Sequence, residues 1–136
     1  MKNFNIRVYG LWLEDKKVLV CKENIRGKEI VKFPGGGLEF GEGTTDCLKR
    51  EWMEELNAEI EISAHFYTTD FFQPSAFDNS QVISIYYTIC PTHTFSIPVF
   101  NGREHFYFRE IDDTLMSEIS LPIDKIVAGM LFERNR

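Results

Sequence analysis

Residues 36–58 read GGLEFGEGTTDCLKREWMEELNA, and this stretch decides both the expected fold and the expected chemistry. Its second half repeats large apolar residues at every fourth position, which is the spacing of one face of an α-helix. These residues are Leu48, Trp52 and Leu56. We therefore predict a helix over residues 44–56 that buries this face against the protein core.

Both ends of the predicted helix carry suitable capping residues. Thr44 is expected to be the N-cap, and Asp46 in the first turn suits the positive end of the helix dipole. Asn57 is expected to end the helix in the left-handed conformation, which Asn tolerates better than most non-glycine residues. Before the helix, Pro34 to Gly37 are expected to interrupt all regular structure, because proline lacks a backbone donor and glycine tolerates positive φ.

Three glutamates, Glu51, Glu54 and Glu55, lie beside the apolar face when the sequence is wound at about 100° per residue. At spacings of three and four residues on a helix, like charges repel by roughly 0.2–0.5 kcal/mol per pair. A bound Mg²⁺ or Mn²⁺ would relieve this repulsion, because both ions prefer hard oxygen ligands. The alternative is a solvated acidic face with surface pairs such as Arg50 to Glu54. The neighbouring glycine loop favours the metal, since its backbone can approach an ion closely.

The spacing of these residues resembles the Nudix box, whose pattern is G-x5-E-x7-R-E-U-x-E-E-x-G-U with U a bulky apolar residue. The matching positions are Gly36, Glu42, Arg50, Glu51, Glu54 and Glu55. Two positions depart from the pattern, because Asn57 replaces the box glycine and Ala58 replaces the final bulky residue. Neither departure removes a carboxylate, so they affect the shape of the loop rather than metal binding.

The resemblance implies a fold of the α/β class, an α/β/α sandwich with a mixed β-sheet. It also implies an Mg²⁺-dependent hydrolase, with Mn²⁺ as a substitute, that cleaves a phosphoanhydride. The implied metal ligands are Glu51, Glu54, Glu55 and a carbonyl of Gly35 or Gly36. The same three glutamates and Arg50 are the implied catalytic residues, with Arg50 orienting Glu51. Glu42 is expected to support the loop or a further ion.

The expected substrate is a small-molecule nucleoside diphosphate linked to another group. Pro74 lies sixteen residues after Ala58, a position at which many ADP-ribose pyrophosphatases also carry proline, and this favours ADP-ribose or a nucleotide sugar. Phe71, Phe72 and Phe77 are candidates for stacking on a nucleobase, although aromatic residues near strand ends are more often core. The candidates for an additional carboxylate from a late strand are Glu104 and Glu110.

Two alternatives remain open at this stage. One is a pyrophosphatase of oxidised nucleoside triphosphates, which would share the box and differ in the base pocket. The other is a Nudix-like ligand-sensing module without catalysis. A module of that kind is expected to lose box carboxylates, whereas this chain keeps Glu51, Glu54 and Glu55. The intact box therefore favours the enzyme.

Outside the box, the sequence predicts strands separated by turns. The expected strands cover residues 4–13, 17–22, 29–33, 58–72, 80–90 and 103–111, with a hairpin link at 14–16. A closing helix is expected to begin at Pro122, with a buried stripe of Ile123, Ile126, Val127, Met130 and Leu131. A mixed sheet covered by helices follows from this order.

Composition excludes several classes of protein. With 136 residues and 43% apolar residues, we expect a single domain over residues 1–136. The net charge of -6 argues against a nucleic-acid binder, and the sequence contains no apolar stretch long enough to span a membrane. Cys21, Cys47 and Cys90 are expected to be reduced, buried thiols in a cytoplasmic protein. His65, His93 and His105 are expected on the surface, and the sequence allows a homodimer.

Overall fold

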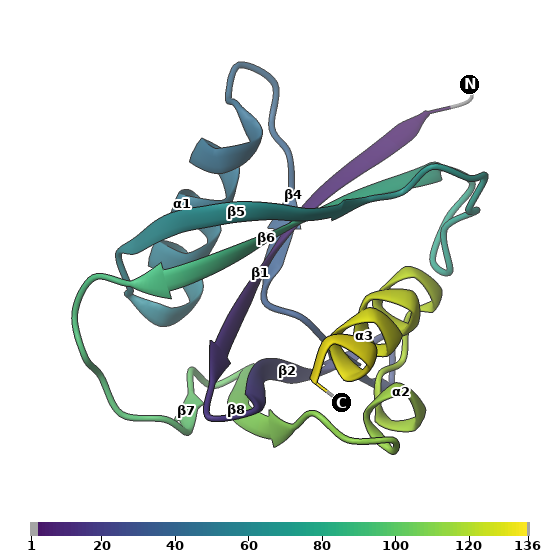
Figure 1. Ribbon diagram of the computed structural model, residues 1–136. Coiled ribbons are helices and arrows are strands. Elements are labelled where there is room, and N and C mark those ends of the chain that lie inside the picture. The colour runs from purple at the N-terminus through teal and green to yellow at the C-terminus, as the bar shows by residue number, and fades with distance from the viewer. Residues whose placement is uncertain (1–2, 136) are drawn as a thin grey trace.

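The computed structural model describes residues 3–135 and shows a mixed β-sheet between helices (Figure 1). The strands are β1 (Phe4–Glu14), β2 (Lys17–Ile25), β3 (Lys28–Lys32), β4 (Gly35–Gly37), β5 (Ile60–Thr68), β6 (Gln81–Pro91), β7 (Val99–Phe100) and β8 (Glu104–Glu110). The helices are α1 (Thr44–Leu56), α2 (Leu115–Glu118) and α3 (Pro122–Asn135). The main strand order is β5-β6-β1-β2-β8-β7, while β3 pairs with β2 and β4 pairs with β1.

Strand β1 organises the sheet because it pairs with three other strands. It runs parallel to β6 and antiparallel to β4, and its last residues form an antiparallel hairpin with β2. The hairpin turns at Asp15 and Lys16, whose φ angles are 48° and 62°. Two successive positive φ angles match the twist of a tight antiparallel hairpin. The predicted hairpin and the predicted mixed α/β sheet are both confirmed.

The two faces of β1 are covered by different helices. Tyr9 and Leu11 point to one face and belong to the same buried cluster as Val127 of α3. Val8 and Trp12 point to the other face and belong to the cluster that contains the buried stripe of α1. This stripe is the predicted one, Leu48, Trp52 and Leu56. In Figure 1, α1 accordingly lies on one side of the strands, with α2 and α3 on the other.

Several predicted elements have different limits in the structure. Pro34 to Gly37 were expected to lack regular structure, but Gly35–Gly37 form β4, whose backbone pairs with β1 at Arg7, Val8 and Tyr9. The strand expected over 58–72 is shorter and covers Ile60–Thr68. Neither β7 nor α2 was predicted, because two and four residues respectively are too few to give a periodic pattern.

Some predictions for single side chains are also wrong. The N-cap of α1 is Gly43, while the Thr44 hydroxyl lies 2.7 Å from the hydroxyl of Tyr87 and contributes no cap. Ile126 is 40% exposed and so does not belong to the buried stripe of α3. Cys90 is exposed, whereas the other two thiols are buried as expected.

Asn57 does end α1 as predicted. Its φ and ψ are 51° and 40°, and its N–H donates to the carbonyl of Met53 at 3.0 Å. Across residues 3–135, none of the helices has the length and apolarity that a membrane span requires.

Candidate functional site

A cavity of about 580 Å³ opens between the sheet, the loop at residues 73–77 and the start of α3. Three alternate residues of β1, Asn5, Arg7 and Tyr9, form its floor together with Val82 and Ser84 of β6. The glycines of β4 lie along one side of this floor. The predicted metal-binding region and a second, unpredicted polar region therefore belong to one cavity.

The backbone requires glycine at Gly35, and the lack of a side chain at Gly36 leaves room for Glu51. A Cβ atom on Gly35 would lie 2.1 Å from the carbonyl oxygen of Val8, and the φ of Gly35 is 155°. A Cβ atom on Gly36 would lie 2.3 Å from the carboxyl carbon of Glu51. The Glu51 carboxylate is thus packed directly against the main chain of Gly36. This contact brings together two features of the box that are fifteen positions apart in the sequence.

Arg50 connects the loop after β4 to helix α1. Its Nη2 and Nε atoms donate to the two carboxylate oxygens of Glu42 at 2.8 Å and 3.0 Å. Its Nη1 donates to Glu51 at 3.1 Å, and Nη2 also donates to the carbonyl of Gly37 at 3.1 Å. The hydrogen bond from Arg50 is the main reason why the pKa of Glu42 falls to about 2. The arrangement is the one expected if Arg50 orients Glu51.

Glu55 and Glu104 are adjacent carboxyl groups at the same end of the cavity. Burial first, and then the neighbouring Glu104, raise the pKa of Glu55 to about 10. Burial also acts to raise the pKa of Glu104, but hydrogen bonds from Glu55 and from the Asn101 amide outweigh it and hold that pKa below its usual value. Burial and the neighbouring carboxyl group thus favour the protonated form of Glu55, while Glu104 is the member of the pair whose ionised form is favoured.

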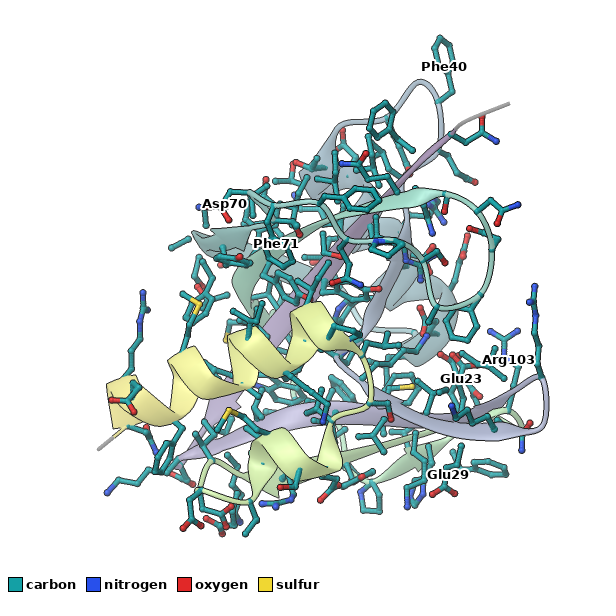
Figure 2. All side chains as sticks on the ribbon, turned by 90° about the vertical axis from the view of Figure 1, so that its right-hand side faces the viewer. Glu23, Glu29, Phe40, Asp70, Phe71 and Arg103 are labelled. Atoms are coloured by element: carbon teal, nitrogen blue, oxygen red, sulfur yellow. The ribbon has the colours of Figure 1, made fainter. Side chains whose placement is uncertain are left out.

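A buried ion pair borders the carboxylates. Lys32 on β3 lies 2.5 Å from Glu23 on β2, and both side chains are nearly inaccessible to solvent. Arg103, just before β8, lies 3.6 Å from Glu23 and 3.5 Å from Glu104. Figure 2 shows Glu23 and Arg103 next to each other. Lys32 and Arg103 are therefore two cations that lie beside the acidic residues of the cavity, with Glu23 as their shared partner.

Asp124 on α3 is the deepest carboxyl group of the cavity. It accepts hydrogen bonds from the Tyr86 hydroxyl and from the backbone N–H of Phe33. Burial is the largest influence on this group and raises the pKa of Asp124 to about 6. The cavity thus has a further carboxyl group, on α3 and close to the Tyr86 and Tyr9 hydroxyls.

The predicted site residues do not all reach the cavity. Glu51, Glu55 and Glu104 line it, as do Gly35 and Gly36. The side chain of Glu54 is 60% exposed and contacts Arg50 at 3.4 Å, at the solvent side of the helix. Residues outside the lining include Phe71, Phe72 and Glu110, all of them exposed. Phe71 is labelled in Figure 2.

The cavity contains one of the aromatic candidates and several residues that were not predicted. Phe77, the third candidate for stacking on a nucleobase, is the aromatic residue that the loop contributes, and Pro74 also lines the cavity. Arg7 and Tyr9 were treated only as part of a strand, although the polar residues Asn5 and Arg7 alternate with apolar ones. This alternation marks one face of a strand as polar and could have drawn attention to them. His65, His93 and His105 are exposed, as expected.

The residues present fit a divalent cation, as three observations indicate. The carboxylate of Glu51 lies against a main chain that only glycine allows. Atom Oε2 of Glu55 is buried and, within residues 3–135, has no hydrogen-bond partner. Glu55 and Glu104 are side-by-side carboxyl groups, and a cation beside them would favour the ionised form of both. In the same part of the chain, no group of three or more His, Cys, Asp or Glu side chains is arranged so that it could hold a metal ion without rearrangement.

The chain is similar to known proteins both in its sequence family and in its fold. The family model of the NUDIX domain matches residues 1–126. No curated protein sequence matches the chain significantly. A NUDIX hydrolase from Nitrosomonas europaea is similar in structure, with a TM-score of 0.77, 16% identity, and coverage of 96% of this chain and 89% of that one.

Two other solved structures share the fold. The MutT protein from Methanosarcina mazei Go1 has a TM-score of 0.75 and 18% identity, with coverage of 99% of this chain and 97% of its own. The E. coli ORF135 protein has a TM-score of 0.72 and 17% identity, with coverage of 99% and 94%. Identities this low show a common fold alone, whereas the family model extends over most of the sequence. On that evidence, the chain belongs to the Nudix hydrolase family.

Proposed function

We propose that this protein is an Mg²⁺-dependent hydrolase that cleaves the phosphoanhydride of a nucleoside diphosphate linked to another group. The observation that carries the proposal is the meeting of Glu51, Glu55 and Glu104 at one end of a cavity. These carboxyl groups come from α1 and β8, two elements that are distant in the sequence. The products would be a nucleoside monophosphate and a phosphorylated remainder.

The proposed metal ligands are Glu51, Glu54, Glu55, Glu104 and a carbonyl of Gly35 or Gly36. A bound Mg²⁺ would lower the pKa of a water molecule and neutralise phosphate charge. Arg50 would hold the Glu51 carboxylate in place through its hydrogen bond at 3.1 Å. Glu54 lies on the exposed side of the helix, so it would act from the solvent side of the site.

The polar floor of the cavity supports a substrate with a large hydrophilic part. Asn5 and Arg7 line this floor, and the buried cation of Lys32 acts against burial to lower the pKa of both Glu55 and Asp124. A sugar or sugar phosphate offers many hydrogen-bonding groups to such a surface, unlike a purely apolar base pocket. Phe77 at the loop is the aromatic side chain available for a nucleobase. We therefore favour ADP-ribose or a nucleotide sugar.

A substrate panel tests this proposal. The protein would be incubated with ADP-ribose, nucleotide sugars, dinucleoside polyphosphates and oxidised nucleoside triphosphates, with Mg²⁺ and then with EDTA. The last class belongs in the panel because some proteins of similar fold are MutT proteins. We expect hydrolysis of at least one nucleoside diphosphate derivative, loss of turnover in EDTA, and a nucleoside monophosphate among the products. Inactivity towards every compound, with tight binding of one of them, would instead support a ligand-sensing module.

A further inference from the structure

Arg7 lies in the middle of the cavity floor. In the sheet it is paired with Gly37 of β4 on one side and with Ser84 of β6 on the other. Because Gly37 has no side chain, its place is open to the guanidinium: a Cβ atom there would lie 3.4 Å from Nη1 of Arg7. The guanidinium of Arg7 therefore extends along β4 next to the glycine that follows the metal-binding pair.

The partners of Arg7 are unusual for a half-buried cation. Its Nε donates to the hydroxyl of Tyr9 at 3.1 Å, and its guanidinium carbon lies 5.8 Å from the centre of the Tyr9 ring. Within residues 3–135, no carboxylate lies within 4.0 Å of this guanidinium, and neither terminal nitrogen has a hydrogen-bond acceptor. By contrast, Arg50, Arg103 and Arg109 each contact at least one carboxylate.

A partly buried charge without a counterion destabilises a protein unless something else compensates for it. The two terminal nitrogens of a guanidinium form a planar fork that matches two oxygens of a phosphate. In Arg7, the two terminal nitrogens lie in the cavity and donate to no acceptor within residues 3–135. The arrangement is suited to an anionic ligand that brings its own oxygens.

The pleat of β4 determines where such a ligand would lie. Successive positions of a strand face opposite sides, so Gly36 faces α1 and contacts Glu51, while Gly37 faces the floor and adjoins Arg7. A phosphate at this edge of the glycine strand would have the carboxylates on one side and the Arg7 guanidinium on the other. Burial acts to lower the pKa of Arg7, but the neighbouring Tyr9 and then Glu51 and Asp124 act to raise it, and the pKa lies above its usual value.

We infer that Arg7 is a phosphate-binding residue, whose guanidinium donates to the phosphoryl oxygens of the substrate from the floor of the cavity. This inference rests on the proposed function in one respect, because it identifies the bound group as a phosphate of that substrate. It goes beyond the box, since Arg7 lies twenty-nine positions before the first box glycine. Tyr9 is then a positioning residue that fixes the fork through Nε.

The competing interpretation is that Arg7 has a structural role, in which its hydrogen bond fixes the Tyr9 hydroxyl in the folded protein. The two interpretations make opposite predictions for the ligand-free protein. If Arg7 were structural, replacing it by Met would lower the melting temperature, because a hydrogen bond to a buried hydroxyl would be lost. If Arg7 is a binding residue, Arg7→Met removes an unpaired charge and should leave the melting temperature equal or higher.

The experiment is a calorimetric titration with inorganic pyrophosphate, with and without Mg²⁺, combined with thermal melting of each variant. For Arg7→Met we expect at least a tenfold loss of pyrophosphate affinity and no loss of thermal stability. Arg7→Lys should lose less affinity, because it keeps the charge but not the fork. Lys17→Met removes the same charge from an exposed position at the start of β2, outside the cavity lining, and should change affinity less than twofold.

Two outcomes would overturn the inference. One is equal pyrophosphate affinity for wild type and Arg7→Met, and the other is no pyrophosphate binding by wild type under either metal condition. Because the titration measures binding without turnover, it separates this inference from the proposed function. An inactive protein that loses pyrophosphate with Arg7→Met would keep the inference and reject the enzyme. An active enzyme whose pyrophosphate affinity does not depend on Arg7 would keep the proposed function and reject the inference about Arg7.

Discussion

Arg50 and Glu42 form a two-pronged ion pair, with contacts of 2.8 Å and 3.0 Å, that ties the glycine-rich loop to helix α1. The same guanidinium reaches Glu51 with its remaining terminal nitrogen. A single side chain therefore sets the distance between the loop and the carboxylate that lies against it. A change in the Arg50 guanidinium should therefore alter the position of Glu51 in the site more than the packing of the core.

Arg50→Lys tests the fork while keeping the charge. A lysine ammonium lacks the planar fork with which Arg50 donates to both carboxylate oxygens of Glu42 and also to Glu51. We expect at least a tenfold loss of turnover per folded molecule and a loss of roughly 1–2 kcal/mol in the free energy of unfolding. Turnover and urea denaturation measured on the same preparation check both values. Unchanged turnover would show that Arg50 does not position Glu51.

Asn57→Val tests the end of α1. The φ of Asn57 is 51°, and a β-branched residue is strongly disfavoured in this conformation. We expect a loss of about 1–2 kcal/mol in the free energy of unfolding for Val, and a neutral or slightly stabilising effect for Gly. Chemical denaturation of the two variants gives the comparison. Equal stability for Val and wild type would contradict the left-handed assignment.

Leu48→Ala separates stability from chemistry on the same helix. Leu48 is fully buried against the sheet and does not line the cavity. Its truncation should cost roughly 2–5 kcal/mol of stability. Turnover per folded molecule, with the folded fraction taken from circular dichroism, should remain within about threefold of wild type. A much larger loss of turnover in the folded fraction would mean that the packing of α1 controls the site.

Asp124 predicts a pH dependence of stability. Burial is the main reason why its pKa rises from 3.8 to about 6, although Tyr86, Lys32 and Arg7 all act in the opposite direction. A carboxyl group whose pKa is higher in the folded state takes up a proton on folding, so it stabilises most below pH 3.8 and loses this contribution as pH rises through 6. The full change corresponds to roughly 3 kcal/mol.

The measurement is urea denaturation of wild type and Asp124→Asn between pH 4 and pH 7.5. We expect the stability of wild type to fall relative to that of the variant as pH rises through this range, because Asn does not titrate. Parallel pH profiles for the two proteins would show that Asp124 does not change its proton affinity on folding.

The sequence predicted those parts of the site that belong to one helix and one loop. Leu48, Trp52 and Leu56 are buried because helical spacing places them on one face, and Asn57 adopts the expected conformation. The resemblance to a known family also identified Gly36 and Glu51, which the structure brings into contact. Within residues 36–58, helical periodicity and the spacing of the box are enough to predict which side chains are buried and which belong to the site.

The rest of the site depends on sheet register, which local patterns do not reveal. β4 was missed because three glycines carry no side-chain periodicity, yet their backbones pair with β1. Arg7 faces the cavity only because β1 lies between β4 and β6. Phe71 and Phe72 lie outside the cavity, in the loop that follows the end of β5 at Thr68, whereas Phe77 of the same loop lines it.

The most direct test of the central claim is the turnover of Glu55→Gln as a function of Mg²⁺ concentration. A glutamine can take the place of a protonated Glu55, because its amide can also donate a hydrogen bond to Glu104. It cannot become the anionic ligand that the metal requires. The fold and the melting temperature should therefore change little, while direct Mn²⁺ binding weakens and turnover falls at least 100-fold at every Mg²⁺ concentration. If Glu55→Gln kept more than about a tenth of wild-type turnover, a deficit below roughly 1.4 kcal/mol, metal-dependent catalysis at this carboxylate cluster would be contradicted.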